Sequence, residues 1–242
     1  MDFTCRVVDI EDATHDIRML RLEPPPGVRF DFHAGQYAKL GFGALPPRDY
    51  SMANTPGEPL LEFHIRDVGD GASRYAVRQL GRGETVTASG PLGDAYLRDE
   101  HAGPILAIAG GSGLAPMKAI VETALRRDPS REIRLYFGVR RERDLYLVAH
   151  FERLAAAHAR FRFVPVVAEP NESSARRSGM VGDAVAADAA DFLNTKAYLA
   201  GPPPMVEATV ALLHARGLSA ADIHADPFYS EEENRRRRGQ SE

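Results

Sequence analysis

The sequence predicts an N-terminal antiparallel β-barrel followed by an α/β domain with a parallel sheet. Short apolar runs with partial alternation, separated by proline and glycine, fill residues 1–100 and are typical of a small antiparallel barrel. From Pro104 onward, strand-like runs alternate with helical patterns, which indicates βαβ units. The change from the first pattern to the second falls in residues 98–103, a polar stretch with no periodic pattern. We therefore expect a barrel domain over residues 1–100 and an α/β domain over residues 101–230.

Six short runs in the first part are expected to form the strands of the barrel. Clusters of proline and glycine separate several of them and mark turns. One helical pattern interrupts the runs, from Ser73, which can act as an N-cap, to Leu80 just before Gly81. The expected strands are residues 3–8, 17–22, 36–42, 50–53, 60–65 and 84–89.

The pattern of the second part is typical of a parallel sheet with helices on both faces, in the manner of a nucleotide-binding, Rossmann-like domain. The expected strands are residues 105–109, 133–139, 161–167 and 197–200. The expected helices are residues 114–127, 145–159 and 205–216.

Composition limits the classes of function. The chain has 242 residues, of which 44% are apolar, enough to fill the cores of two domains of ordinary size. The net charge of −4 argues against nucleic acid as the main partner. Apolar runs fall far short of the roughly twenty residues that span a bilayer, and the first residues do not resemble a secretory signal. We expect a cytoplasmic protein with no membrane span.

Charged residues dominate the end of the chain, residues 231–242. Three glutamates at 231–233 precede four arginines at 235–238. Clustered charge without apolar spacing buries too little surface to offset the entropy of ordering, so we expect a disordered tail. A docking arm is the alternative.

Cys5 is the only cysteine of the chain. It allows neither an intrachain disulfide nor a thiolate-held iron–sulfur cluster within this chain. We expect Cys5 to behave as a small buried hydrophobe in the first strand. The histidines show no metal-ligand spacing, so no metal site is expected.

Two motifs carry candidate chemistry. Arg48-Asp49-Tyr50-Ser51 closes the barrel half, and a glycine-rich segment from Gly110 to Pro116 follows an apolar strand. Glycines after such a strand let the backbone approach a pyrophosphate, and the next helix offers its free N–H groups and its positive dipole end. Taken alone, the glycine segment could be a tight connection and the arginine motif an ordinary strand end.

The order of these and further motifs resembles that of the ferredoxin–NADP reductase superfamily, with a particular likeness to flavin reductases and to the reductase modules of bacterial ring-hydroxylating oxygenases. The likeness extends from about Phe3 to Tyr229. The motifs that carry it are Ala34-Gly35-Gln36-Tyr37, Arg48-Asp49-Tyr50-Ser51, His64-Ile65-Arg66, Gly71-Ala72-Ser73, Gly90-Pro91-Leu92-Gly93, the segment that starts at Gly110, Gly201-Pro202-Pro203-Pro204-Met205 and Asp226-Pro227-Phe228-Tyr229.

The resemblance implies an FAD site on the barrel. Arg48 would pair with the FAD pyrophosphate, Tyr50 would lie against the flavin ring, and the Ser51 hydroxyl would reach the ring nitrogen that accepts hydride. Phe228 is a candidate to cover the ring, and the implied catalytic residues are Tyr50, Ser51 and Phe228. The resemblance implies backbone contacts to the flavin from His64, Ile65 and Arg66. It also implies a second anion-binding site at a helix start, formed by Gly71, Ala72 and Ser73.

The resemblance also implies a nicotinamide dinucleotide site in the second domain. Beyond the last expected strand, Gly201, Pro202 and Met205 would lie near the nicotinamide, together with Phe228. Related ferredoxin–NADP reductases often have cysteine just before this Gly-Pro pair, whereas this chain has Ala200, which puts a thiol role in doubt. The residues expected to hold the dinucleotide in the glycine segment are Gly110, Gly111, Ser112, Gly113 and Pro116.

Arginines after the second expected strand bear on the choice between NADH and NADPH. Arg140 and Arg141 lie where the adenosine ribose would be and could bind the extra phosphate of NADPH, but Glu142 beside them would repel it. We expect NADH, with NADPH as the alternative.

These features together predict an FAD-dependent NAD(P)H oxidoreductase. Electrons would pass from reduced nicotinamide through FAD to a separate acceptor, such as a ferredoxin, an oxygenase component or free flavin. Two alternatives stay open: a flavin reductase that releases reduced free flavin, and a non-catalytic electron-transfer subunit that binds nucleotide.

Overall fold

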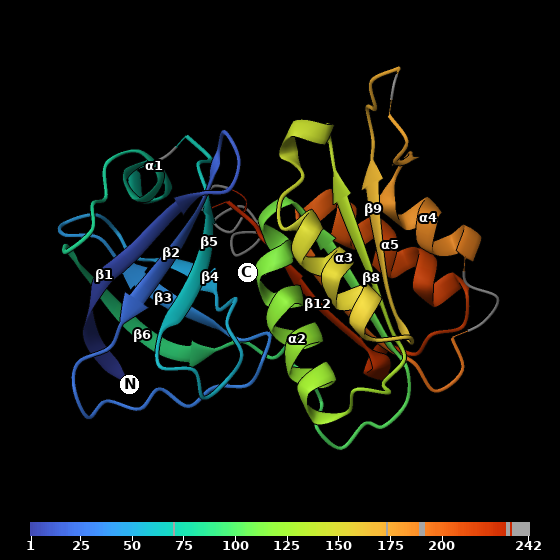
Figure 1. Cartoon of the computed structure of the whole chain (residues 1–242), viewed down its shortest axis with the longest axis horizontal. Coiled ribbons are helices and arrows are strands. Elements are labelled where there is room, and N and C mark those ends of the chain that lie inside the picture. Colours follow the sequence, from blue (N-terminus) through green and yellow to red (C-terminus); the bar gives the residue numbers. More distant parts are fainter. Residues whose placement is uncertain (70, 173, 189–191, 231–232, 234–242) are drawn as a thin grey trace, which may run out of the picture.

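The computed structural model describes residues 1–69, 71–172, 174–188, 192–230 and 233. It shows an antiparallel barrel lying beside a parallel sheet that is covered by helices (Figure 1). The predicted fold class, an antiparallel barrel followed by an α/β domain with a parallel sheet, is therefore confirmed. Apart from Glu233, the expected disordered tail at 231–242 lies outside the described residues.

Six antiparallel strands form the barrel, in the order β4-β3-β6-β1-β2-β5. An isolated bridge between Met52, just after β4, and Phe63 of β5 joins the two ends of this order, so the barrel is nearly closed. The strands are β1 (Asp2–Asp12), β2 (Ile17–Glu23), β3 (Tyr37–Gly41), β4 (Arg48–Ser51), β5 (Leu61–Arg66) and β6 (Thr85–Leu92).

Helix α1 (Gly71–Arg78) packs on the barrel core through Ala72, Ala76 and Val77, whose spacing places them on one face. The helix begins at Gly71, earlier than the Ser73 start that the sequence suggested. Ser73 therefore lies in the first turn, where its hydroxyl oxygen accepts the Val68 N–H at 3.2 Å.

The second domain contains a parallel sheet in the order β10-β9-β8-β7-β11-β12. Its strands are β7 (Ile105–Gly110), β8 (Ile133–Val139), β9 (Phe161–Val167), β10 (Arg177–Ser178), β11 (Lys196–Gly201) and β12 (Ile223–Pro227). Its helices are α2 (Leu114–Arg127), α3 (Val148–Ala157), α4 (Val181–Asp188) and α5 (Pro203–Ala215).

Helices cover both faces of this sheet. Along β7, Ala107 and Ala109 pack into the core shared with α2 and α3, whereas Leu106 and Ile108 pack into a second core with α4 and α5. Adjacent side chains of a strand point to opposite faces, so a continuous apolar run such as β7 supplies both layers.

Three elements of the second domain were not predicted: β10, α4 and β12. The sequence of β12, Ile223-His-Ala-Asp-Pro, has neither an apolar run nor a clear alternation, so its strand geometry comes from pairing with β11. The expected helix from residue 145 is also wrong at its start. Helix α3 begins at Val148, because Leu147 adopts a left-handed conformation with φ of 55° and Leu145 is extended.

The two domains share apolar packing. Ile17, Met19 and Ala34 of the barrel belong to the same buried cluster as Met117 and Ile120 of α2. Figure 1 shows α2 on the side of the second domain that faces the barrel. The barrel is thus seated on the helix that follows the glycine segment. In the part of the chain that the structure describes, no helix has the length and apolar character needed to cross a membrane.

Candidate functional site

Strand β4 presents the arginine motif at the open seam of the barrel. Alternation along the strand places the half-buried side chains of Arg48 and Tyr50 on one face and the buried Ser51 on the other. The Tyr50 ring packs edge-on against Phe42 with centroids 6.2 Å apart, and Phe42 lies at the same centroid distance from Tyr75 of α1. The arginine motif therefore lies beside helix α1.

The start of helix α1 faces this strand. A β-carbon on Gly71 would lie 3.5 Å from Leu45 Cδ2, in the turn that leads into β4. The first turn of α1 carries no acidic side chain, and Ala72 and Ser73 are buried. A guanidinium group and a helix N-terminus are the two common donors to a pyrophosphate. The residues present fit the diphosphate of FAD.

Strand β5 runs along the same seam and carries His64, Ile65 and Arg66. The Ile65 side chain is in the barrel core, and the fully buried His64 ring points toward the second domain, so neither side chain is turned outward. Arg66 is exposed, and its Nε donates to Asp16 at 2.8 Å. What β5 offers a ligand is therefore its backbone and the Arg66 guanidinium.

Three glycines of the predicted dinucleotide site allow close contacts inside the second domain. A β-carbon on Gly110 would lie 2.5 Å from Met205 Sδ, and one on Gly201 would lie 2.7 Å from the Gly110 carbonyl oxygen. A β-carbon on Gly113 would overlap the carbonyl oxygen of Ala200. These glycines let the carboxyl ends of β7 and β11 pack closely with the turn after β7 and with helix α5, in addition to any role toward a ligand.

Gly111 is different, because it faces the barrel. Its φ is 54°, and a β-carbon placed there would lie 3.5 Å from Arg66 Nη1. Ser112 beside it is half-buried. Pro116 lies in the first turn of α2, where its missing N–H costs little. The glycine segment and strand β5 therefore meet across the domain boundary.

The remaining predicted residues of the second domain gather at the end of β11. Pro202 precedes α5 directly, and Met205 contacts the position of Gly110. The Phe228 N–H donates to the Gly201 carbonyl at 2.8 Å, and the half-buried ring packs on the core shared by the domains. The structure thus brings Gly201, Pro202, Met205 and Phe228 to the same sheet edge as the glycine segment.

Arg140 lies on this edge too, but two strands away from β11, after β8. Its Nε donates to Glu169 at 2.7 Å, and Arg141 Nε donates to the second oxygen of the same carboxylate at 3.3 Å. Sequence reasoning missed Glu169, because it is nearly thirty residues away and follows a different strand.

A buried polar network at the domain boundary was also missed. Lys118 of α2 donates to the Ala53 carbonyl at 3.1 Å and pairs with Glu62 Oε1 of β5 at 3.2 Å. His64 Nε2 lies 3.0 Å from the same Glu62 oxygen, and its Nδ1 lies 3.1 Å from the Tyr146 hydroxyl. A carboxylate can only accept, so Nε2–H donates to Glu62 and Nδ1 accepts the Tyr146 hydrogen. No local pattern in the sequence points to such cross-domain pairs.

Ionisation in this network follows from burial. Burial lowers the pKa of His64 below its ordinary value, which keeps the ring neutral. Burial alone would raise the pKa of Glu62, but the hydrogen bond from His64 and the charge of Lys118 lower it well below its usual range. The Lys118–Glu62 pair therefore joins the domains. Each member also has a partner in its own domain, Glu122 for Lys118 at 3.4 Å and Arg21 for Glu62 at 3.2 Å.

Asp226 of β12 is a further titratable group near the seam. Burial raises its pKa to about 6, and the negative charge of Asp49 in the barrel adds to the shift. Asp226 comes two residues before Phe228, so its charge changes close to a predicted site residue. Across the described residues, no group of three or more His, Cys, Asp or Glu side chains could hold a metal ion.

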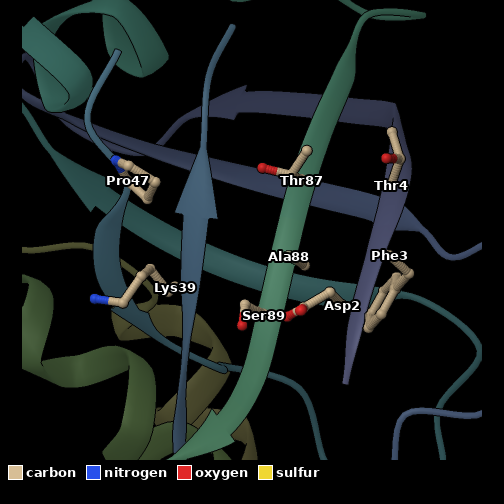
Figure 2. A pocket seen from close by; sticks show the side chains of 8 residues that line it. All are labelled: Asp2, Phe3, Thr4, Lys39, Pro47, Thr87, Ala88 and Ser89. Atoms are coloured by element: carbon tan, nitrogen blue, oxygen red, sulfur yellow. The ribbon is translucent and has the colours of Figure 1, made fainter. Parts of the chain in front are cut away.

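A shallow hollow of about 330 Å³ lies elsewhere on the barrel, over β1, β3 and β6 (Figure 2). It is lined by Asp2, Phe3, Thr4, Lys39, Pro47, Thr87, Ala88 and Ser89. None of these residues belongs to the arginine motif or the glycine segment. The hollow nevertheless borders the arginine motif, because Pro47 directly precedes Arg48 and Lys39 pairs with Asp49 at 2.7 Å.

Comparison with known protein families gives two matches that together cover most of the chain. Residues 4–96 match the oxidoreductase FAD-binding domain, and residues 107–211 match the oxidoreductase NAD-binding domain. The first match covers the barrel with its arginine motif, and the second includes the glycine segment.

Curated relatives include the ferredoxin–NAD(P)(+) reductase component of a naphthalene 1,2-dioxygenase system from Pseudomonas putida. It is 42% identical over 226 residues, covering 92% of this chain and 68% of the relative. The reductase subunit of an aromatic O-demethylase from Amycolatopsis is 40% identical over 238 residues, covering 94% of this chain and 69% of the relative.

Solved structures show the same likeness. A cytochrome P450 reductase from Amycolatopsis superposes with a TM-score of 0.88 at 39% identity, covering 94% of this chain and 70% of that one. The ferredoxin reductase in carbazole 1,9a-dioxygenase gives a TM-score of 0.85 at 29% identity, covering 95% and 70% of the two chains. This chain, an FAD-binding barrel followed by an NAD-binding α/β domain, thus belongs to the ferredoxin–NADP reductase superfamily.

Proposed function

We propose that this protein is an FAD-dependent NAD(P)H oxidoreductase that passes electrons to a separate ferredoxin or oxygenase component. One observation carries the proposal: Arg66 at the end of β5 lies next to Gly111 of the glycine segment, 3.5 Å from where its β-carbon would be. The strand expected to follow the flavin and the segment expected to hold the dinucleotide are therefore neighbours. The relatives named as reductase components of oxygenase systems support the choice of acceptor.

The barrel residues have distinct tasks in this proposal. Arg48 and the N-terminal turn of α1 hold the diphosphate of FAD, and Tyr50 lies against the ring. The Ser51 hydroxyl stabilises the charge that changes at the ring nitrogen. Bound FAD supplies the ability to accept a hydride and to pass on its electrons one at a time.

The second domain positions the reduced dinucleotide. Gly111 and Ser112 hold the phosphates at the start of α2, while Pro202 and Met205 line the nicotinamide end of the sheet edge. Phe228 would cover the flavin ring and would yield its place to the nicotinamide. The shared core between the barrel and α2 keeps the two binding surfaces in a fixed relation, which makes hydride transfer effectively intramolecular.

Absorbance spectroscopy tests the proposal directly. The purified protein should carry a visible flavin spectrum that survives desalting, bleaches anaerobically with NADH or NADPH, and returns when ferricyanide is added. Flavin lost on desalting but reduced during turnover would favour the free-flavin reductase instead. If the protein retains its flavin but neither NADH nor NADPH bleaches it, the result would favour the non-catalytic electron-transfer subunit.

A cytoplasmic location is part of the same proposal, because reduced nicotinamide dinucleotides and the proposed acceptor components are found there. Fractionation of the producing cells with an antibody to the protein provides the test. Recovery in the membrane or extracellular fraction would contradict it.

A further inference from the structure

The carboxyl ends of β8 and β9 carry a compact cluster of charges, which we call the ribose-side cluster: Arg140, Arg141 and Glu169. The sheet order β9-β8-β7-β11-β12 matches the 3-2-1-4-5 order of a dinucleotide-binding fold, with the glycine segment after the first of these strands. In that arrangement, the adenosine half of a dinucleotide extends from the glycine segment toward the second strand, β8. The ribose-side cluster lies at the end of that strand.

Backbone pairing fixes the cluster in place. The Ala168 N–H donates to the Val139 carbonyl at 2.9 Å, and the Glu169 N–H donates to the Arg140 carbonyl at 2.8 Å. The β8–β9 ladder thus continues beyond the two strands and sets Arg140 and Glu169 opposite each other. The carboxylate then engages both guanidinium groups, Arg140 at 2.7 Å and Arg141 at 3.3 Å.

Both arginines are turned toward the carboxylate through their Nε atoms. The neighbourhood has no formal net charge, because its three guanidinium groups are balanced by three carboxylates: Arg140, Arg141, Arg143, Glu142, Asp144 and Glu169. A 2′-phosphate arriving here would meet a nearby carboxylate between the two arginines, while a 2′-hydroxyl carries no charge to be repelled.

We infer that Glu169 sets the preference of this protein for NADH by occupying Arg140 and Arg141, which would otherwise bind the 2′-phosphate of NADPH. The inference rests on the proposed function. It assigns a specificity role to a residue outside the glycine segment and on a different strand from the two arginines. Glu169 and Arg140 are exposed, and exposed ion pairs contribute little to stability, so this pair can be altered without unfolding the domain.

The test compares two matched variants. Glu169→Gln keeps the size and the acceptor oxygen of the side chain and removes its charge. Glu132→Gln is the control, because Glu132 also bridges two arginines, Arg134 at 3.1 Å and Arg160 at 2.8 Å, but just before β8, at the opposite edge of the sheet. For each protein, kcat/KM is measured with NADH and with NADPH, using ferricyanide as acceptor.

We expect Glu169→Gln to raise the NADPH/NADH ratio of kcat/KM by about tenfold, the value of one charge-assisted hydrogen bond gained. Adding Arg140→Ala to this variant should remove most of the gain, since the two residues act on the same phosphate. Glu132→Gln should leave the ratio as in the parent. A parent that prefers NADPH, an unchanged ratio in Glu169→Gln, or an equal rise in the control would each overturn the inference.

Binding gives a second readout that does not depend on turnover. Calorimetric titration of the holoprotein with adenosine 2′,5′-bisphosphate and with adenosine 5′-monophosphate isolates the effect of the 2′-phosphate. Glu169→Gln should tighten binding of the first compound only, and equal changes for both would contradict the inference. If neither NADH nor NADPH reduced the parent, the proposed function would fail, while this titration would still decide the role of Glu169.

Discussion

Arg48 lies half-buried on β4, on the same face as Tyr50 and beside the start of helix α1. In the proposed FAD site, replacing it with alanine would remove one charge-assisted contact to the diphosphate, worth about 1.5–3 kcal/mol. We expect Arg48→Ala to weaken FAD binding by roughly ten- to a hundredfold with little change in fold. Flavin content after dialysis and circular dichroism together measure this.

Lys39→Ala provides the matched control for Arg48. Lys39 is a cation on the neighbouring strand, and it pairs with Asp49 at 2.7 Å. The Lys39→Ala protein should retain FAD as well as the parent protein does. If the well-folded Arg48→Ala protein also binds FAD with unchanged affinity, Arg48 does not hold the diphosphate.

Gly111 combines a positive φ with a position that faces Arg66. A valine there would resist the backbone angle and would block the approach of a dinucleotide. We expect Gly111→Val to raise the KM for NADH or abolish turnover while flavin stays bound. Steady-state kinetics and the flavin spectrum give the answer.

Gly27→Val separates backbone strain from blockage of the site. Gly27 has a φ of 80° and lies in a turn of the barrel, where a β-carbon would meet nothing within 4 Å among the described residues. This variant should lose some stability but keep the parental KM. Parental kinetics in Gly111→Val would show that the segment is only a connection.

At the level of elements, β12 brings Asp226 to the domain boundary with a pKa raised to about 6 by burial. The folded state therefore holds a proton that the unfolded state releases, and this contribution to stability is lost as pH rises from about 4 through about 6. Asp226→Asn should raise the free energy of unfolding by about 1–3 kcal/mol near pH 8, and by much less near pH 4.5. Thermal unfolding at the two pH values measures this.

Asp222 supplies a control of opposite sign for this pH dependence. Its hydrogen bond from Lys196 lowers the pKa of its carboxyl group, so its charged form is the favoured one. Asp222→Asn should lose stability at the higher pH, by a small amount because the pair is partly exposed. If Asp226→Asn were less stable than the parent near pH 8, the assigned origin of the shift would be wrong.

For the whole molecule, we expect that the path of electrons involves no thiolate of this chain. Cys5 is buried in β1, and burial raises its pKa to about 12, so the thiol stays protonated. We expect Cys5→Ser to reduce ferricyanide with NADH at near-parental rates, and iron analysis to find no stoichiometric iron. A collapse in rate with flavin still bound, or bound iron with inorganic sulfide, would refute this.

Elements with strong local patterns could be predicted from the sequence. The apolar run of β7, the glycines after it and the amphipathic α2 are encoded within short windows, and the arginine motif marked β4. Strand β12 and helix α4 escaped prediction because pairing with β11 and packing against α5, rather than local periodicity, determine them.

The candidate site could be predicted only in part, for the same reason. Backbone motifs are visible in consecutive residues, so the glycine segment and Arg48 could be found. Glu169 and Lys118 act through partners that only the folded chain brings near, from another strand or from the other domain. Their roles depend on long-range geometry for which a single sequence offers no local signal.

The buried pair of Lys118 and Glu62 has a consequence for recombination within the superfamily. Each domain contributes one of the two charges, and both side chains are nearly inaccessible to water. A chimera that takes its barrel from one reductase and its α/β domain from another would lose this pair wherever the donor lacks one of the two residues. Each charge would keep a partner in its own domain, Glu122 for Lys118 at 3.4 Å and Arg21 for Glu62 at 3.2 Å, so the loss falls on the contact between the domains. Exchange of modules within the superfamily therefore preserves this contact between the domains only where the two positions are inherited together.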